Sequence, residues 1–483
     1  MPVFATDAAP ICRPEHRRLI LAAAVMASSM GFIDSSVTAI ALPAIRTSLG
    51  GSLVAAQWLT GAYLLTLSSV ILVGGAASDR FGVVRVFAAG IVAFVASSVL
   101  CALAQTMLQI DIARALQGLG AAFMVPGSMT LISRAHPRDQ RGAALGLWAS
   151  ASTATTAFGP VLGGLLLTMG GPEIWRAIFA LNLPLGLGAL WILRRYTLPD
   201  QGRPGTPIDL IGAALATLGL GLLAWSMSDV GPKSLPALCA AILLLALFLA
   251  WEARHPAPMI RLAMFRNRAF AAANLATLFL YTGIIGVMFY LPMTAISVWH
   301  VSAFGVTAAF LPTSVMIALL SSRSGRLADR IGPGPLMAGG ATLVALGYAA
   351  IAYNAPKAEF FSHTVPFMFV VGLGLALLVA PLTVAVMSNA AESEQGAASG
   401  INNAVARVAG LIAVALMGRV AAWSYGGVTA QMPGFGLKAT GAAHIIATST
   451  AFSHIAALAA ALALASALAS AIGLRRKRTT PSC

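Results

Sequence analysis

The segment GGAASDRFG, residues 74–82, recurs 250 residues later as SGRLADRIG, residues 324–332. The repeat aligns Asp79 with Asp329 and Arg80 with Arg330, and each copy follows a long apolar run. Self-similarity at a fixed offset is the sequence signature of an internally repeated architecture. Both copies fall in loops that the charge distribution assigns to the same side of a membrane, so the repeat predicts two halves that share one orientation.

The composition of the chain predicts a polytopic membrane protein. Its 483 residues are 58% hydrophobic and 9% charged, with a mean hydropathy of +0.86, whereas soluble domains carry about 25% charged residues. A bilayer core of about 30 Å needs about 20 apolar residues per helix. Fourteen such runs follow one another, over residues 19–43, 53–76, 83–104, 107–133, 142–168, 174–193, 208–230, 234–251, 269–296, 303–322, 335–354, 364–388, 396–423 and 447–473.

Lysine and arginine residues concentrate in alternate loops. Twenty-two of the thirty lie in the loops and tails on one side of the predicted spans. The opposite side carries five, namely Arg46, Arg176, Lys233, Lys357 and Lys438. This asymmetry follows the positive-inside rule, so we expect both termini in the cytoplasm and an even number of spans. The net charge of +15 then indicates topology and contact with anionic lipid, and nucleic acid is not expected as a partner.

The spacing of the repeat predicts three parts. Six spans with short loops need about 180–210 residues, so an offset of 250 residues leaves room for two additional helices, which residues 208–251 supply. We therefore predict an amino-terminal six-helix bundle over 1–193, a linker with two additional spans over 194–268, and a carboxy-terminal six-helix bundle with a basic tail over 269–483.

Several stretches resemble the major facilitator superfamily, and within it the fourteen-span drug:proton antiporters. The resemblance runs through nearly the whole chain. It rests on the two loop repeats and on GFIDSSVTAIALPAI (31–45), QWLTGAYLL (57–65), RALQGLGAAFMVPGS (114–128), GPVLGG (159–164), WRAIFALNLPLG (175–186) and ASGINNAVARVAG (398–410). The resemblance implies a major facilitator fold, all α-helical with two six-helix bundles and two extra central helices, in the cell inner membrane.

Asp34 and Arg114 are the charged residues that the bilayer makes most costly. Asp34 lies roughly 14 Å and Arg114 roughly 10 Å below the outer ends of their predicted spans, and a charge there costs about 3 kcal/mol on insertion scales. A carboxylate that is alternately buried and exposed beside a cation changes its proton affinity, which is the elementary step of proton coupling. We expect Asp34 to carry the proton and Arg114 to tune it. The alternative is a static ion pair that only fixes helix packing.

Other polar residues in the spans are candidates for the substrate cavity. Gln117 lies one turn after Arg114 and on the same helix face. We also select Asn274, Tyr281, Tyr290, Thr383, Asn402, Asn403 and Arg407. Some lie in spans that correspond to cavity-lining helices of the family, and the others are polar residues inside a span. The alternatives are helix packing for the amides, lipid-facing positions for the aromatic residues and snorkelling for Arg407.

Two further sets of residues match the family's gating and antiporter motifs. The repeated loop is expected to gate the cytoplasmic side through Gly75, Asp79, Arg80, Gly82, Arg85, Gly325, Asp329, Arg330 and Gly332. The fifth-span pattern, which in the family marks antiporters, comprises Gly146, Gly159, Pro160, Gly163 and Gly164. The alternatives are a solvated loop turn and ordinary small-residue packing, and the recurrence of the loop in both halves favours the gate.

No pattern in the chain indicates an enzyme. It contains neither a phosphate-binding loop nor the HExxH or GxSxG motifs, and its four cysteines form no metal-ligand spacing. We expect no cofactor or metal, and a monomer that exports small lipophilic compounds, neutral or monovalent, in exchange for protons. The alternatives are export of an endogenous metabolite or organic anion, and a receptor or scaffold that does not transport.

Overall fold

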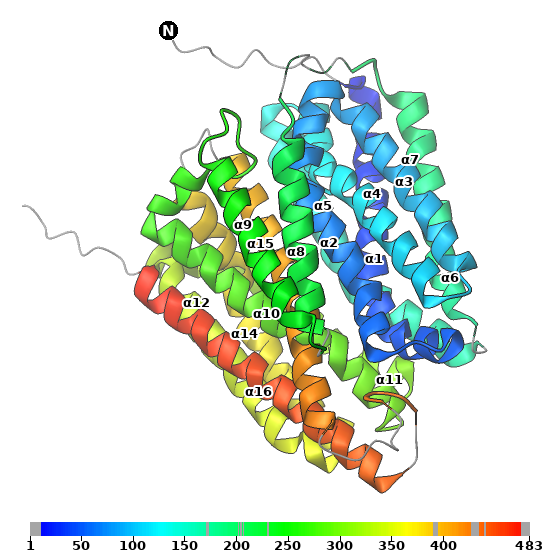
Figure 1. The fold of residues 1–483 in the computed structure, drawn as a ribbon. Helices are drawn as coiled ribbons and strands as arrows, with labels where there is room; N and C mark the ends of the chain where they lie inside the picture. Colours follow the sequence, from blue (N-terminus) through cyan, green and yellow to red (C-terminus); the bar gives the residue numbers. More distant parts are fainter. Residues whose placement is uncertain are drawn as a thin grey trace, which may run out of the picture.

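The computed structural model describes residues 11–170, 173–200, 202, 205, 207–228, 231–389, 395–426, 434–438 and 441–474. Long antiparallel helices make up almost all of these ranges, and an isolated bridge ties Cys12 to Thr197. Figure 1 shows the amino-terminal helices gathered on one side of the molecule and the carboxy-terminal helices on the other.

The amino-terminal bundle begins with the short turn η1 (Pro14–His16). Its helices are α1 (Arg17–Leu49), α2 (Leu53–Phe81), α3 (Val83–Leu103), α4 (Met107–Ala135), α5 (Arg138–Met169), α6 (Trp175–Ala180) and α7 (Asn182–Tyr196). The predicted sixth span, 174–193, is therefore two helices, α6 and α7, which meet at a turn at Leu181. Several helices continue past the predicted spans, because hydropathy marks only the lipid-embedded part of a helix.

The two additional helices are α8 (Leu210–Ser228) and α9 (Ser234–Glu252), which pack against each other in front of the bundles (Figure 1). The carboxy-terminal bundle follows after η2 (Leu262–Arg266). It comprises α10 (Arg268–Ser297), α11 (Ala303–Ile331), α12 (Pro333–Asn354), η3 (Ala355–Lys357), α13 (Phe360–His363), α14 (Val365–Ser388), α15 (Gln395–Tyr425) and α16 (Ala442–Gly473).

The predicted fold class is confirmed. Among the described residues, thirteen helical segments are long and apolar enough to cross a membrane, with α6–α7 and α13–α14 each forming one segment. The 32-residue helix α5 occupies the place of the remaining predicted span. The chain is thus an all-α, multi-pass membrane protein.

The sequence repeat is also a structural repeat. Helices α2 and α11 have 29 residues each, and they begin and end 250 positions apart. Ser52 and Ser302 cap their first turns, since each hydroxyl accepts a hydrogen bond from a backbone N–H three residues later. Gly82 and Gly332 follow the two helices with φ of +96° and +88°, a conformation that favours glycine. The same local chemistry therefore starts and stops the matching helix in each half.

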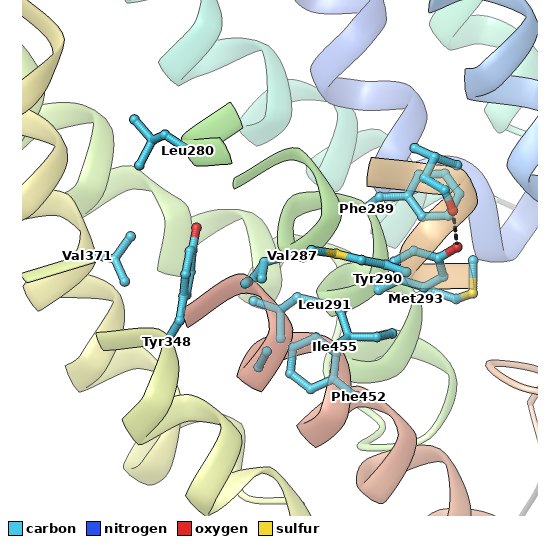
Figure 2. Close-up of a cluster of buried hydrophobic side chains, with 14 of the residues drawn as sticks. Leu280, Val287, Phe289, Tyr290, Leu291, Met293, Tyr348, Val371, Phe452 and Ile455 are labelled. Atoms are coloured by element: carbon cyan, nitrogen blue, oxygen red, sulfur yellow. Dashed lines mark hydrogen bonds between the residues drawn. The ribbon is translucent and has the colours of Figure 1, made fainter. Parts of the chain in front are cut away.

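The carboxy-terminal bundle buries an aromatic core (Figure 2). Tyr290 of α10 is fully buried, and its ring packs edge-on against Phe289. Its hydroxyl donates to the Val414 carbonyl on α15 at 2.7 Å and accepts from Gln57 Nε2 on α2 at 3.0 Å. A buried hydroxyl needs such partners, and here one of them comes from the opposite bundle.

The two bundles are joined at the end that the charge distribution assigns to the outer side. Helix α2 packs along α15, and α5 packs along α11. Besides the Gln57–Tyr290 bond, the Phe304 amide of α11 donates to Thr168 Oγ1 of α5 at 3.3 Å. Arg46, near the end of α1, donates to the Phe435 carbonyl between α15 and α16. These described contacts join the two bundles at that end.

Adjacent glycines in α2 give a matched test of helix packing. A β-carbon on Gly74 would overlap the Ala122 carbonyl of α4, whereas nothing lies within 4 Å of the corresponding point on Gly75. We expect Gly74→Ala to lower the free energy of unfolding by about 1–3 kcal/mol and Gly75→Ala to change it little, as measured by thermal unfolding of purified protein. Equal effects of the two substitutions would contradict this packing.

Candidate functional site

A buried ion pair joins α1 and α4. Asp34 and Arg114 are each 1% exposed, and Arg114 Nη1 donates directly to Asp34 Oδ2. The Arg114 Nε donates to the Leu59 carbonyl on α2 at 3.0 Å. The guanidinium centre also lies 4.5 Å from the centre of the Tyr63 ring. The sequence placed these two charges at similar depth, and the structure brings them into contact.

Gln117 completes the first ring of contacts around Asp34. Its Nε2 donates to Asp34 Oδ1 at 2.9 Å, while its Oε1 accepts from Arg114 Nη1 at 2.5 Å. Arg114 and Gln117 are three residues apart, so the helix presents both on one face. Each oxygen of the Asp34 carboxylate therefore has its own donor, which compensates for the loss of water around it.

Close packing of α4 on α2 makes this geometry possible. A β-carbon on Gly118 would overlap the Tyr63 carbonyl and Thr66 Oγ1 of α2, so only glycine allows the two backbones to approach this closely. This approach brings the Leu59 carbonyl and the Tyr63 ring to the Arg114 guanidinium. Gly118 lies in the stretch 114–128 that carries the resemblance, and the structure shows which contacts depend on it.

Sequence reasoning missed the second layer of this network. Ser98 of α3 is fully buried, and its hydroxyl accepts from Gln117 Nε2 at 2.8 Å and from Asn182 Nδ2 at 3.1 Å. Asn182 begins α7 within the stretch that carried the resemblance, but no role followed from the motif alone. The signal that could have identified both residues is polarity within an otherwise apolar span.

A second carboxylate lies near the pair. Asp111 lies one turn before Arg114 in α4. Asp111 is half-buried, and its Oδ1 is buried without a hydrogen-bond partner among the described residues. Arg114 forms its ion pair with Asp34. Asp111 is therefore a second carboxylate near this pair.

The predicted cavity residues fall into separate places. Asn402 Nδ2 donates to Thr277 Oγ1 at 2.8 Å and to Asn274 Oδ1 at 3.2 Å, which joins α15 to α10. Asn403 and Thr383 are exposed and donate to carbonyls of their own helices. Asn402 and Asn274 therefore hold two helices together, which is the alternative interpretation given for the amides.

Arg407 and Tyr281 are half-buried. Arg407 is close enough to act electrostatically on Tyr281 in its own bundle and on Tyr63 in the other. The cation therefore faces the region between the bundles. This location is compatible with contact to substrate, as one of the two interpretations of Arg407 requires.

The glycines of α5 pack against both bundles. The β-carbon of a residue replacing Gly163 would overlap the Val37 side chain of α1, and at Gly164 it would lie 2.5 Å from Thr307 Oγ1 of α11. At Gly159 it would lie 3.3 Å from the Ile33 backbone. Gly146 has no atom within 4 Å of its β-carbon position, and the side chain of Pro160 lies outside the described residues.

The repeated motif was expected in loops, but its residues form the last turns of α2 and α11, at their predicted cytoplasmic ends, and Gly82 and Gly332 follow the two helices. Asp79, Arg80, Arg85 and Arg330 are exposed there, and the side chain of Asp329 lies outside the described part of the chain. A β-carbon on Gly325 would lie 3.6 Å from Ala380 of α14, which is ordinary contact. The gating role of the repeated motif stays a prediction.

The first loop has an anchor that the motif does not contain. Asp200, 4% exposed, accepts from the Val84 amide at the start of α3 at 3.2 Å and from Arg134 Nη1 of α4 at 2.8 Å. A carboxylate at a helix N-terminus is stabilised by the backbone amides there. Asp200 falls in the predicted linker 194–268, and nothing in its sequence context indicates where it docks.

Arg46 lies at the predicted end of the first span, but in a helix and not in a loop. It is in the last turn of α1 and is 2% exposed. Its Nε donates to the Gly51 carbonyl at 2.9 Å, and Nη1 donates to the Phe435 carbonyl of the opposite bundle. Helix α1 continues beyond the apolar run, so the basic residue is enclosed by protein at the outer end.

The fold has two bundles of the same orientation, helices that meet across the bundles and a buried ion pair between α1 and α4. These are the features of a membrane carrier. Residues 24–414 match the family model described as Major Facilitator Superfamily. The chain belongs to this superfamily.

Relatives of known name agree with this assignment. The tetracenomycin C resistance and export protein of Streptomyces glaucescens is 32% identical over 427 residues, which cover 86% of this chain and 77% of the relative. The methylenomycin A resistance protein of Bacillus subtilis is 29% identical over 445 residues, with 89% and 92% covered. The resemblance predicted from the motifs is confirmed.

Solved structures share the fold. A bacterial homologue of the human lysosomal transporter Spinster superimposes with a TM-score of 0.69 over 97% of this chain and 99% of that one, at 16% identity. A D-xylose–proton symporter gives a TM-score of 0.64, with 92% and 96% covered, at 17% identity. At these identities the similarity concerns the fold alone.

A double-mutant cycle tests the ion pair. Asp34→Asn leaves a buried guanidinium without a counter-charge, so we expect it to lower the free energy of unfolding by about 3–5 kcal/mol. With Arg114→Met and the double variant, the cycle should give a coupling free energy of about 1–3 kcal/mol, measured by thermal unfolding of the purified protein. Additive effects of the two substitutions would show that the pair does not interact.

Proposed function

We propose that this protein exports small lipophilic compounds, neutral or monovalent, across the cell inner membrane in exchange for protons. Asp34 carries the proton and Arg114 tunes its affinity. The observation that carries the proposal is the enclosure of the Asp34 carboxylate by donors from Arg114 and Gln117 at a depth where an uncompensated charge is costly. The relatives named for antibiotic resistance and export support the direction and the class of substrate.

In the proposed mechanism, a proton competes with Arg114 and Gln117 for the Asp34 carboxylate. In the state described, Arg114 and Gln117 each donate a hydrogen bond to one oxygen of this carboxylate. If the bundles move so that α4 shifts against α1, the carboxylate loses these donors and takes up a proton from the outer side. Re-formation of the contacts on the return releases that proton inward. Export is then coupled to proton entry because each transition changes the partner of Asp34.

Alternating access requires that each side close in turn. The described contacts close the outer side through Arg46, Gln57 and the packing of Gly164 on α11. We assign the opposite closure to the repeated cytoplasmic loops, with both termini in the cytoplasm. The functional unit is a monomer, and its basic cytoplasmic face contacts anionic lipid.

Export of an organic anion is the second candidate, because Arg407 faces the region between the bundles. A guanidinium there would hold a carboxylate substrate through charge-assisted hydrogen bonds. If the substrate is an organic anion, Arg407→Gln should abolish its transport. If the substrates are neutral lipophilic compounds, the same variant should still export them. A receptor or scaffold that does not transport is the third interpretation, and it predicts that changes at Asp34 have no effect on movement of any compound.

Proton release provides the test. When lipophilic compounds are added to purified protein in weakly buffered detergent solution, a pH-sensitive dye should report proton release from the wild type. Because Asn cannot bind a proton, we expect at least about a tenfold smaller signal from Asp34→Asn. Glu173→Gln is the matched control. Glu173 is exposed in an outer loop, and hydrogen bonds from Ser48 and Arg176 hold its pKa below its usual value, so this variant should respond as the wild type does.

The outcomes separate the interpretations. Equal release from wild type and Asp34→Asn would assign the proton to another group, of which Asp111 is the nearest on α4. Absence of release from every protein, together with binding of organic anions that depends on Arg407, would favour the second candidate.

A further inference from the structure

Two carboxylates are buried together where α8 begins and α9 ends, outside both six-helix bundles. Asp209 is 5% and Glu252 is 3% exposed. A β-carbon on Gly212 would lie 2.5 Å from Asp209 Oδ2 and 2.8 Å from Glu252 Oε1, so the two oxygens border the same small space. The mechanism proposed above does not use either residue.

The hydrogen bonds around the pair are unequal. Asp209 Oδ1 accepts from the Gly212 amide at 2.7 Å, and Trp251 Nε1 lies 3.0 Å from both Asp209 oxygens. Both oxygens of Asp209 therefore have a donor. Glu252 Oε2 accepts from the Ile260 amide at 2.7 Å, but Glu252 Oε1 is buried and has no hydrogen-bond partner among the described residues.

A proton on Glu252 accounts for this arrangement. Two adjacent buried carboxylates cannot both carry a charge at low cost. A protonated Oε1 becomes a donor, and the acceptor beside it is Asp209 Oδ2. The geometry points to a proton-binding site in which Glu252 holds one proton and shares it with Asp209.

This site fastens the linker between the two halves. Glu252 Oε2 holds the Ile260 amide, and the chain then runs through η2 into α10, the first helix of the carboxy-terminal bundle. Loss of the proton places two negative charges side by side. The repulsion loosens the contact among α8, α9 and the segment 253–267. Since the protonated form stabilises the contact, it is present at lower pH and is lost as the pH rises through the deprotonation of Glu252.

Of the other charged groups, His255 is the one that the described contacts place beside the pair. The linker also carries Arg261, and the helices that pack against α8 carry Asp79 and Arg80 of α2 and Arg407 and Arg419 of α15. His255 Nδ1 lies 3.9 Å from Asp209 Oδ2, and its ring stacks on Trp251 with centroids 5.3 Å apart. Arg419 donates to the Ser226 carbonyl at the opposite end of α8.

Hydrogen–deuterium exchange of the purified full-length protein tests the site without any substrate. Exchange rates of peptides that cover residues 253–267 are divided by the intrinsic rate at each pH. In the wild type, protection should fall by about tenfold or more between about pH 6 and about pH 9. Glu252→Gln keeps the hydrogen bonds but cannot ionise, so its protection should not change with pH. His255→Gln should keep the transition of the wild type.

Infrared difference spectra over the same pH range provide the second measurement. The carbonyl stretch of a protonated carboxyl should disappear as the pH rises in the wild type and in Glu173→Gln, and it should be missing in Glu252→Gln. The proposal is overturned if protection in the wild type does not depend on pH, if Glu252→Gln retains the transition, or if His255→Gln abolishes it. None of these outcomes depends on whether Asp34 couples transport.

Discussion

A charge within the bilayer must be compensated by protein, and this constraint organises the amino-terminal bundle. Asp34 and Arg114 are each 1% exposed and neutralise one another. Their remaining hydrogen-bonding groups reach Gln117 and the Leu59 carbonyl, and Gln117 in turn reaches Ser98 and Asn182. Four helices besides α1 therefore meet around one carboxylate. A change in the charge of Asp34 therefore alters contacts of all these helices. A proton-driven movement of helices requires a coupling of this kind.

Close helix approach is the second requirement, and small residues provide it within and between the bundles. Gly74 and Gly118 bring α2 and α4 together, and Gly163 and Gly164 place α5 between α1 and α11. Because α5 contacts α1 on one side and α11 on the other, it links the helix that carries Asp34 to the opposite bundle. In lipid, association of this kind depends on packing and hydrogen bonds more than on burial of apolar surface.

Much of the fold could be predicted from the sequence, because hydropathy, charge asymmetry and the repeat each depend on short stretches of chain. The family and the fold class are confirmed, whereas the three-part division and the roles of the site residues remain predictions. The sequence also placed Asp34 and Arg114 at similar depth. It could not identify Ser98, Asn182 or Asp200, because contacts between helices depend on how each helix is rotated. Arg46 was expected in a loop after the first span and lies in a helical turn instead, because α1 continues beyond the apolar run.

Transport driven by a pH gradient in proteoliposomes tests the central claim most directly. Wild-type protein and Asp34→Asn are compared in two modes, accumulation of a lipophilic compound against its gradient and exchange of that compound at equilibrium. The account predicts that only the wild type concentrates the compound in response to the pH gradient, whereas any movement that Asp34→Asn retains only equilibrates it. Accumulation by Asp34→Asn that still follows the pH gradient would contradict the assignment of Asp34 as the proton carrier.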